Sequence, residues 1–205
     1  MELTTWLALV GICLMGAMSP GPSLAVVLKH CLHGGLRGGV ICAVSHGLGV
    51  GLYALLAVLG LGSLQQTFPI LFDVIIFAGA AYLLYLAYGS WRAQATKMNF
   101  NKAKSVHRSA AQDGFAIAFL NPKLAVFFVA LFSQFIPQGE ISATQQVVMV
   151  ATPTLIDTLW YVLVAVMCSH PRFYPWLERN QLSINKLLAV AFVCLATTVI
   201  IRNIL

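Results

Sequence analysis

The sequence predicts an all-α integral membrane protein with six transmembrane helices, and three observations support this fold class. Of the 205 residues, 60% are hydrophobic and only 9% are charged, whereas soluble domains carry about 25% charged residues. Six apolar segments reach the roughly 20 residues that a helix needs to cross a bilayer. Proline motifs interrupt two of these segments, the first and the fourth, and a broken helix persists in a membrane only where protein or a wet cavity surrounds it.

The six predicted spans form a single transmembrane domain over residues 1–205. The second is rich in small residues, which let helices approach closely in lipid and permit a homo-oligomer without showing one. The third ends in Tyr88 and Trp91, which suit the membrane interface. Ser142 and Gln145 have the spacing of a capping box at the start of the fifth. The spans cover residues 4–28, 39–62, 69–89, 114–136, 146–168 and 185–204.

The basic residues set the predicted orientation. Ten of the twelve Lys and Arg lie in three polar intervals, at residues 29–37, 92–108 and 172–186. Cytoplasmic loops of membrane proteins carry such an excess, so we expect these intervals inside and both termini outside. This placement accounts for the net charge of +6 without nucleic acid as a partner. Five spans with one re-entrant segment are the alternative, but that arrangement would put a basic interval outside.

The two halves of the chain repeat a short pattern. Residues 22–26 and 122–126 both have the form Pro-x-Leu-Ala-Val, and Tyr53 with its neighbours matches Tyr161 with its own. Repeats of about 1–90 and 113–205, joined by a cytoplasmic linker of about 91–112, each contain three spans. They therefore cross the membrane in opposite senses. Inverted repeats of this kind, with broken helices at the substrate site, are typical of secondary transporters.

The predicted breaks, in spans one and four, are candidate binding sites. Ser19-Pro20-Gly21-Pro22 interrupts span one, and Asn121-Pro122 interrupts span four. A cap residue followed by proline favours a helix start, and the amides of a helix N-terminus favour an anion such as a carboxylate. Simple kinks are the alternative. We expect the amides after Pro22 and Pro122, together with Ser19, Ser23 and Asn121, to bind the substrate.

Four ionisable residues within the predicted spans are candidates for a functional role. Lys123 is the one cation that belongs to no loop, and Asp157 is its natural partner, with Asp73 a weaker candidate. Lys123 could instead extend to the inner surface. Asp157 could bind the substrate ammonium, pair with Lys123 or carry a proton. Histidine as a residue type can gain or lose a proton near neutral pH, so His46 is a second candidate for proton coupling, or else a hydrogen-bonded structural residue.

Two other classes of membrane protein are alternatives. A cation or metal exporter would need several converging carboxylates or histidines, and a thiol-disulfide protein would need cysteines at facing positions. The five cysteines are scattered without a Cys-x-x-Cys pair. The sequence indicates no resident metal and no cofactor.

With these residues, the chain resembles the lysine exporter (LysE/RhtB) family of bacterial amino-acid efflux permeases, in particular the threonine/homoserine exporter branch. The similarity rests on Ser19–Pro22, Asp157 and three motifs further along the chain: Gly79-Ala80-Ala81-Tyr82-Leu83, Asn121-Pro122-Lys123 and Ala130-Leu131-Phe132-x-Gln134-Phe135. Many members carry Asn or Asp where this chain has Ser23.

The resemblance implies a multi-pass carrier of the bacterial inner membrane, surrounded by lipid, and not an enzyme. It implies export of amino acids or close derivatives by exchange with protons, without ATP or a cofactor. Because only Asp157 is placed to neutralise a second positive charge, we expect a small, neutral amino acid or derivative.

Overall fold

The structure, a computed structural model, describes residues 2–19, 21–94, 109–136, 141–168, 170 and 173–204. Within these ranges the regular structure is entirely α-helical, without strands. The helices are α1 (Leu3–Met18), α2 (Pro22–Thr67), α3 (Pro69–Arg92), α4 (Ala110–Phe119), α5 (Pro122–Phe132), α6 (Ala143–Cys168) and α7 (Phe173–Ile204).

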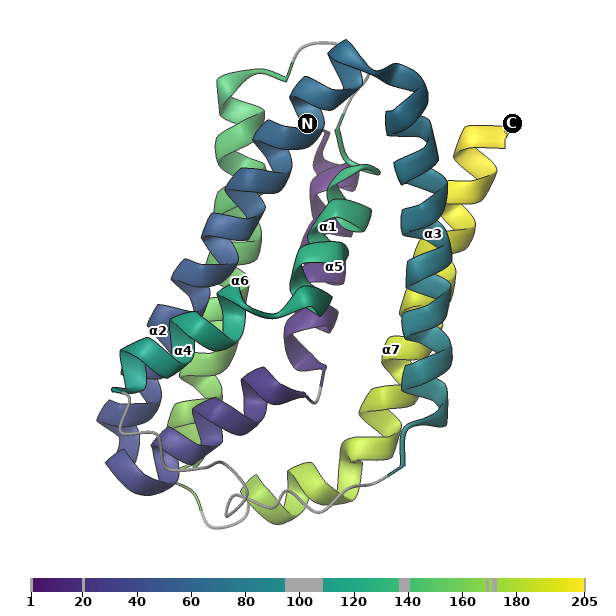
Figure 1. Cartoon of the computed structure of the whole chain (residues 1–205). Helices are drawn as coiled ribbons and strands as arrows, with labels where there is room; N and C mark the ends of the chain where they lie inside the picture. The colour runs from purple at the N-terminus through teal and green to yellow at the C-terminus, as the bar shows by residue number, and fades with distance from the viewer. Residues whose placement is uncertain are drawn as a thin grey trace.

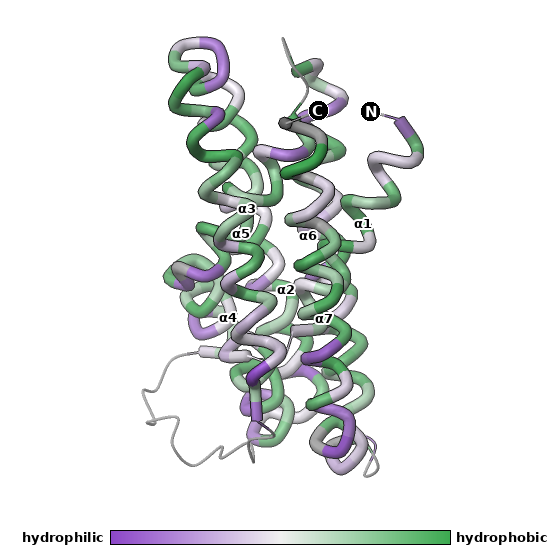
Figure 2. Tube along the Cα trace, turned by 90° about the vertical axis from the view of Figure 1, so that its right-hand side faces the viewer, coloured by the Kyte–Doolittle hydropathy of each residue, from purple (hydrophilic) through white to green (hydrophobic). Residues whose placement is uncertain are grey.

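Several helices are long and apolar enough to cross a membrane. By length and composition, α2, α3, α6 and Arg179–Thr198 of α7 qualify, and α4 with α5 adds a fifth candidate if this pair, bent by 55°, is one span. Figure 2 shows hydrophobic residues along the middle of the bundle and hydrophilic residues gathering toward its ends. The membrane class that the composition predicts is therefore confirmed, while α1, with 16 residues, is a shorter apolar helix.

The helices run back and forth along one bundle axis (Figure 1). The start of α1 and the end of α7 lie at the same end of the bundle. The bend in α2, the end of α3 and the start of α7 lie at the opposite end. We call it the linker end because the predicted linker begins where α3 ends, at Arg92. Arg37 and Arg92, near two of these points, therefore belong to the linker end.

The helix break predicted in the first span is confirmed, although its caps differ from those predicted. Ser19 ends α1 as its C-cap and does not start a helix, and Pro20 lies outside the described residues. Gly21, in extended conformation, precedes Pro22 at the first position of α2. Proline suits this position because its missing amide hydrogen has no partner there in any helix.

The polar interval predicted as a loop between spans one and two is almost wholly helical. The chain turns back at Gly35, the one described residue with positive φ (63°), and α2 thus has two limbs of residues 22–34 and 36–67. Glycine adopts this left-handed conformation without the clash that a Cβ atom would cause. A single residue is enough to redirect the chain here.

The second predicted break, between α4 and α5, is also confirmed. Asn121 caps α5 as predicted: its Oδ1 accepts a hydrogen bond from the Lys123 amide at 3.1 Å, and Pro122 follows the cap. The predicted capping box of α6 forms too, because the Gln145 amide donates to Ser142 Oγ at 3.3 Å. By contrast, α7 begins at Phe173, well before residue 185, so the predicted sixth span is only the later part of a longer helix.

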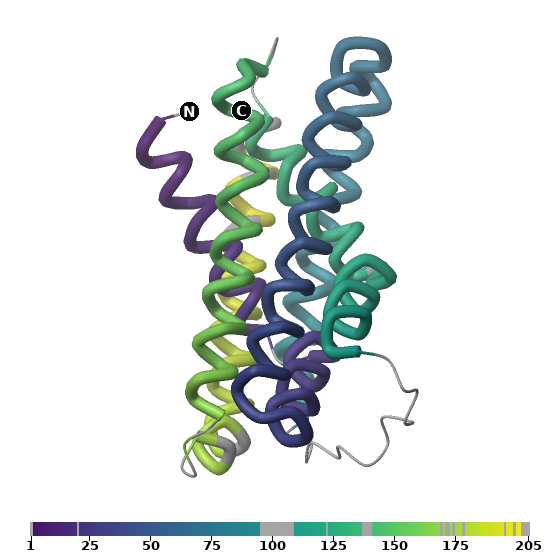
Figure 3. Tube along the Cα trace, turned by 90° about the vertical axis from the view of Figure 1, so that its left-hand side faces the viewer, coloured from purple at the N-terminus to yellow at the C-terminus, as the bar shows by residue number. Residues whose placement is uncertain are grey.

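Close helix contacts hold α2 between α6 and α4 (Figure 3). A Cβ atom added at Gly47 would clash with Thr158 Oγ1 of α6, and one added at Gly114 of α4 would clash with the Cys42 carbonyl oxygen of α2. The small residues predicted to serve helix packing therefore do so within this chain. On the other side of the bundle, α3 packs against α7.

Candidate functional site

A cavity of about 60 Å³ lies beside the two helix breaks. One buried water needs roughly 10–15 Å³, so the cavity has room for several waters or for the polar head of a small molecule. Its wall combines residues of both breaks with side chains of α1, α2, α5, α6 and α7. The polar lining consists of Ser19, Ser23, His46, Asn121, Lys123, Asp157 and Tyr161, and the apolar lining includes Val50, Leu124, Phe127, Phe128 and Phe192.

Lys123 is the cation of this cavity. It lies in the first turn of α5 and its Nζ is 3.4 Å from Ser19 Oγ at the end of α1. No carboxylate forms a salt bridge with it within the described residues. The Lys123 amide already donates to Asn121 Oδ1, and the Leu124 amide donates to the Asn121 carbonyl. The ammonium group, more than the amides at this helix start, is thus available to an anion.

Asp157 and His46 form a buried pair in the same cavity. His46 Nδ1 lies 2.7 Å from Asp157 Oδ2, and the two residues are only 1% and 7% exposed. Tyr161, one turn further along α6, places its ring edge-on to the imidazole, with centroids 4.9 Å apart. Desolvation makes an isolated buried carboxylate unfavourable, and the imidazole satisfies part of its hydrogen-bonding capacity.

The expected pair of Lys123 with Asp157 is not formed in this structure. Asp157 bonds His46 instead, because Gly47 and Thr158 let α2 and α6 approach closely and the residues preceding them face each other. Asp73, the weaker candidate partner, is exposed on α3. Lys123 is half-buried at the cavity wall.

The structure brings together nearly all the residues predicted for the site, from opposite halves of the sequence. Pro20 is outside the described residues, and the Pro122 side chain is likewise not described. Gly21 and Pro22 also line the cavity. Sequence reasoning missed Tyr161 as a lining residue, although its match to Tyr53 in the repeat singled it out, and it missed the phenylalanines, which no pattern distinguishes from core residues.

A second, wider chamber of about 680 Å³ adjoins the cavity. Ser19 and Lys123 belong to both linings, and the rest of the chamber comes from α3, α5, α7 and the residues that follow α3. Tyr82, Ser90 and Asn185 contribute polar groups to this chamber. The contact between Lys123 and Ser19 therefore lies where the two spaces meet.

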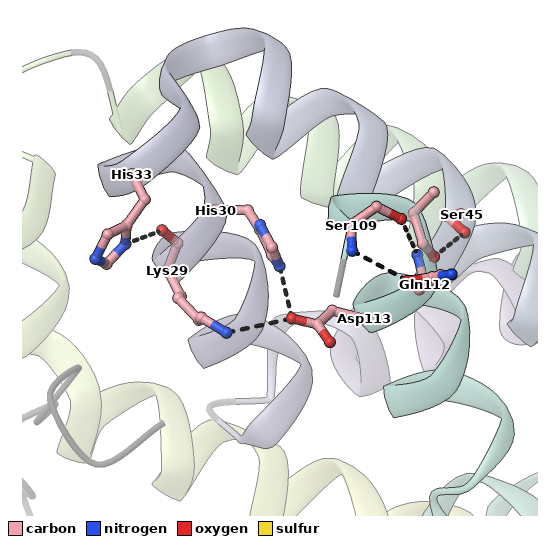
Figure 4. Close-up of polar contacts among 8 residues, drawn as sticks. Lys29, His30, His33, Ser45, Ser109, Gln112 and Asp113 are labelled. Carbon is pink, nitrogen blue, oxygen red and sulfur yellow. Dashed lines mark hydrogen bonds and ion pairs between the residues drawn. The ribbon is translucent and has the colours of Figure 1, made fainter. Parts of the chain in front are cut away.

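A second cluster of charges, outside the cavity, joins the first limb of α2 to α4 (Figure 4). Asp113 Oδ2 lies 3.2 Å from Lys29 Nζ and 2.9 Å from His30 Nε2. Sequence reasoning missed this cluster, because Lys29 and Asp113 are 84 residues apart and no local pattern connects them. The described residues include no group of three or more His, Cys, Asp or Glu side chains that could hold a metal ion.

The five cysteines are free thiols. Cys13 lines the cavity, and the Cys31 and Cys168 side chains are within hydrogen-bonding reach of each other. Cys31 and Cys168 are a facing pair, but neither lines the cavity.

Comparisons with known proteins agree with the resemblance. The chain is 26% identical over 189 residues to the homoserine/homoserine lactone efflux protein of Salmonella typhimurium, an alignment that covers 91% of each chain. It is 32% identical over 136 residues to the leucine efflux protein of Salmonella choleraesuis, covering 65% of this chain and 64% of that protein. No solved structure shows significant similarity. The family of LysE type translocators matches residues 14–203, and the chain therefore belongs to this family.

Proposed function

We propose that the protein is a secondary transporter that exports a small neutral amino acid from the cytoplasm in exchange for protons. The observation that carries this proposal is the cavity beside the two helix breaks, which holds a cation that has no acidic partner among the described residues and, separately, a buried carboxylate. A zwitterion carries one group of each charge on neighbouring atoms. Family membership and the names of the two relatives support amino-acid efflux.

In this proposal, Lys123 and Ser19 bind the substrate carboxylate. A charge-assisted hydrogen bond to an ammonium is stronger than one between neutral groups, and Asn121 and Ser23 add polar groups nearby. The N-terminus of α2, after Pro22, contributes its positive dipole end. Asp157 with His46 faces the substrate ammonium, and Phe127 and its aromatic neighbours face the substrate side chain.

The neutral substrate class follows from the balance of charges. Asp157 is the one carboxylate among the described residues that line the cavity, and one substrate ammonium uses it fully. A basic side chain would need a second acid. The apolar part of the lining suits an aliphatic side chain, and both homoserine and leucine have neutral side chains.

We further propose six membrane crossings in two inverted repeats. In this arrangement α1 with the first limb of α2, and α4 with α5, are the broken spans, and the second limb of α2, α3, α6 and α7 are the continuous ones. The basic linker end would face the cytoplasm of a bacterial inner membrane, and both termini the periplasm. The start of α1 and the end of α7 lie at one end of the bundle, which supports placing both termini on the same side of the membrane.

Transport into inside-out vesicles tests the proposed function. Vesicles containing the protein, with an imposed pH gradient, are supplied with labelled amino acids including leucine, homoserine, threonine and lysine. We expect gradient-dependent uptake of one or a few neutral compounds. Replacing Lys123 by Ala should reduce uptake by about 10- to 100-fold, because a hydrogen bond to a charged group contributes about 1.5–3 kcal/mol.

Lys186→Ala is the matched control, since this lysine is exposed on α7 and lines neither the cavity nor the wide chamber. It should transport like the unmodified protein. Uptake of no amino acid by a folded, inserted protein would contradict the proposal and direct the search to divalent cations, the substrates of the alternative transporter class. Unchanged uptake by Lys123→Ala would contradict the assigned role of Lys123.

A further inference from the structure

One ring nitrogen of the cavity histidine is left without a partner. His46 Nδ1 is bound to Asp157, whereas Nε2 is buried and has no hydrogen-bond partner among the described residues. Buried polar atoms are nearly always satisfied, and an exception in a native structure calls for an explanation. Here the exception lies in the wall of a polar cavity, next to the residue that would face a substrate ammonium. Packing alone gives no reason for a histidine at this point.

The Asp157 carboxylate sets which nitrogen can gain a proton. A carboxylate accepts a hydrogen bond from Nδ1–H, and this leaves the lone pair of the neutral imidazole on Nε2. The pair of Asp157 and neutral His46 therefore carries one net negative charge. When Nε2 takes up a proton, the pair becomes neutral overall and the imidazole becomes a cation.

We propose that a proton on His46 Nε2 and the substrate ammonium exclude each other, so that this one nitrogen couples proton entry to amino-acid export. The inference rests on the proposed function and adds its coupling residue. The neutral imidazole leaves the full charge of Asp157 to the ammonium, whereas the imidazolium cancels that charge and repels a second cation. The other titratable groups lining the cavity are Lys123 on α5, Tyr161 on α6 and Cys13 on α1. None of these supplies a second negative charge at neutral pH.

The cycle balances in protons and charge. Substrate enters from the cytoplasm as a zwitterion, and Nε2 gives its proton to the cytoplasmic solution. After the substrate leaves on the other side, Nε2 takes a proton from the periplasmic solution and carries it back. One proton moves inward for each amino acid that moves outward. By linkage, the factor by which protonation weakens substrate binding equals the factor by which substrate weakens protonation.

Counting protons released on substrate binding tests the inference directly. The purified full-length protein is titrated with leucine and with homoserine by calorimetry, in pairs of buffers that differ in ionisation enthalpy, between about pH 5.5 and 8.5. We expect proton release that approaches one per bound amino acid toward acidic pH, and an apparent Kd that falls as the pH rises, by at most about tenfold per pH unit.

His46→Gln should bind the same amino acid without proton release and with a Kd independent of pH, because an amide offers hydrogen bonds but gains no proton. In vesicles this variant should exchange substrate without responding to a pH gradient. His30→Gln is the matched control: it alters the other histidine paired with an aspartate, which lies outside the cavity. Proton release by this control should equal that of the unmodified protein.

The outcomes separate the two proposals. Binding by the unmodified protein without proton release, or unchanged release by His46→Gln, would overturn the inference while leaving the exporter intact. Failure of the unmodified protein to bind any amino acid would overturn the proposed function and this inference with it. The proton count of the unmodified protein decides the matter even where His46→Gln does not fold, and His46→Asn provides a second variant.

Discussion

The residues of the cavity keep their opposite charges on different helices. Lys123 of α5 contacts a hydroxyl group of α1, and Asp157 of α6 contacts an imidazole of α2. A direct bond between the two charges would have to be broken before a zwitterion could bind either of them. The observed separation leaves one group for each end of the substrate. In the proposed function, Lys123 and Asp157 can therefore each bind one end of the substrate without a bond between them having to break.

Single glycines decide how closely the helices that carry these residues approach. Replacing Gly114 by Ala should destabilise the protein by about 1–3 kcal/mol, because the added methyl group would clash with the Cys42 carbonyl oxygen and backbone must move. Thermal unfolding in detergent measures this change. Gly60→Ala is the control: nothing lies within 4 Å of its added Cβ, so alanine should be neutral or stabilise the helix by up to about 1 kcal/mol. Equal melting temperatures would contradict the close contact.

At the scale of elements, the short helix α4 depends on α2 for its position. Ser45 Oγ donates to the Ala111 carbonyl at 2.6 Å, and Tyr53 OH donates to the Phe119 carbonyl at 2.6 Å. The second of these bonds satisfies a carbonyl at the broken end of α4, where the helix cannot provide a partner. Asp113 then links α4 to the first limb of α2. Side chains from other elements therefore hold α4 and the first limb of α2, which lie next to the two breaks.

The link through Asp113 should be measurable in stability. Asp113→Asn leaves Lys29 and His30 without their mostly buried carboxylate, and we expect a loss of about 1–3 kcal/mol in the free energy of unfolding. Adding Lys29→Met should cost less than the sum of the two single changes, because the unpaired ammonium is then removed as well. Asp73→Asn, on the exposed surface of α3, should change stability by less than about 0.5 kcal/mol. Strict additivity would argue against the link.

At the scale of the whole molecule, the bundle has one basic end and places both chain termini at the other. Arg37 and Arg92 mark the linker end, while α1 begins and α7 finishes at the opposite end. The apolar middle of the bundle separates them. The wide chamber beside Lys123 extends toward the residues after α3. In the proposed orientation this chamber would therefore face the cytoplasm.

Reporter fusions test this orientation. Alkaline phosphatase requires an oxidising compartment for its disulfides, so a fusion after residue 205 should be active and an insertion within residues 91–112 inactive. A fluorescent protein that folds in the cytoplasm should give the reverse pattern at the same two positions. Phosphatase activity at the linker position would contradict the proposed topology and, with it, the cytoplasmic placement of the wide chamber.

The sequence by itself determined the membrane class and the positions of both helix breaks. Bilayer-spanning helices follow from segment length and hydrophobicity, and the breaks follow from proline, which acts on the backbone of its own turn. Asn121 caps α5 for the same local reason. These features need no knowledge of neighbouring helices. The sequence also predicted most residues of the candidate site, because the repeat pattern relates the break at Pro22 to the break at Pro122.

Only the tertiary structure decided which of these residues contact one another. Asp157 forms its hydrogen bond with His46, 111 residues away in the sequence, and not with Lys123. The close contact of Gly47 with Thr158 brings α2 and α6 together next to this pair. The cluster at Asp113 likewise needs the bend at Gly35, which turns the first limb of α2 toward α4. Such pairings depend on distances between helices to within an ångström, and that spacing is a property of the packed bundle, not of any one segment.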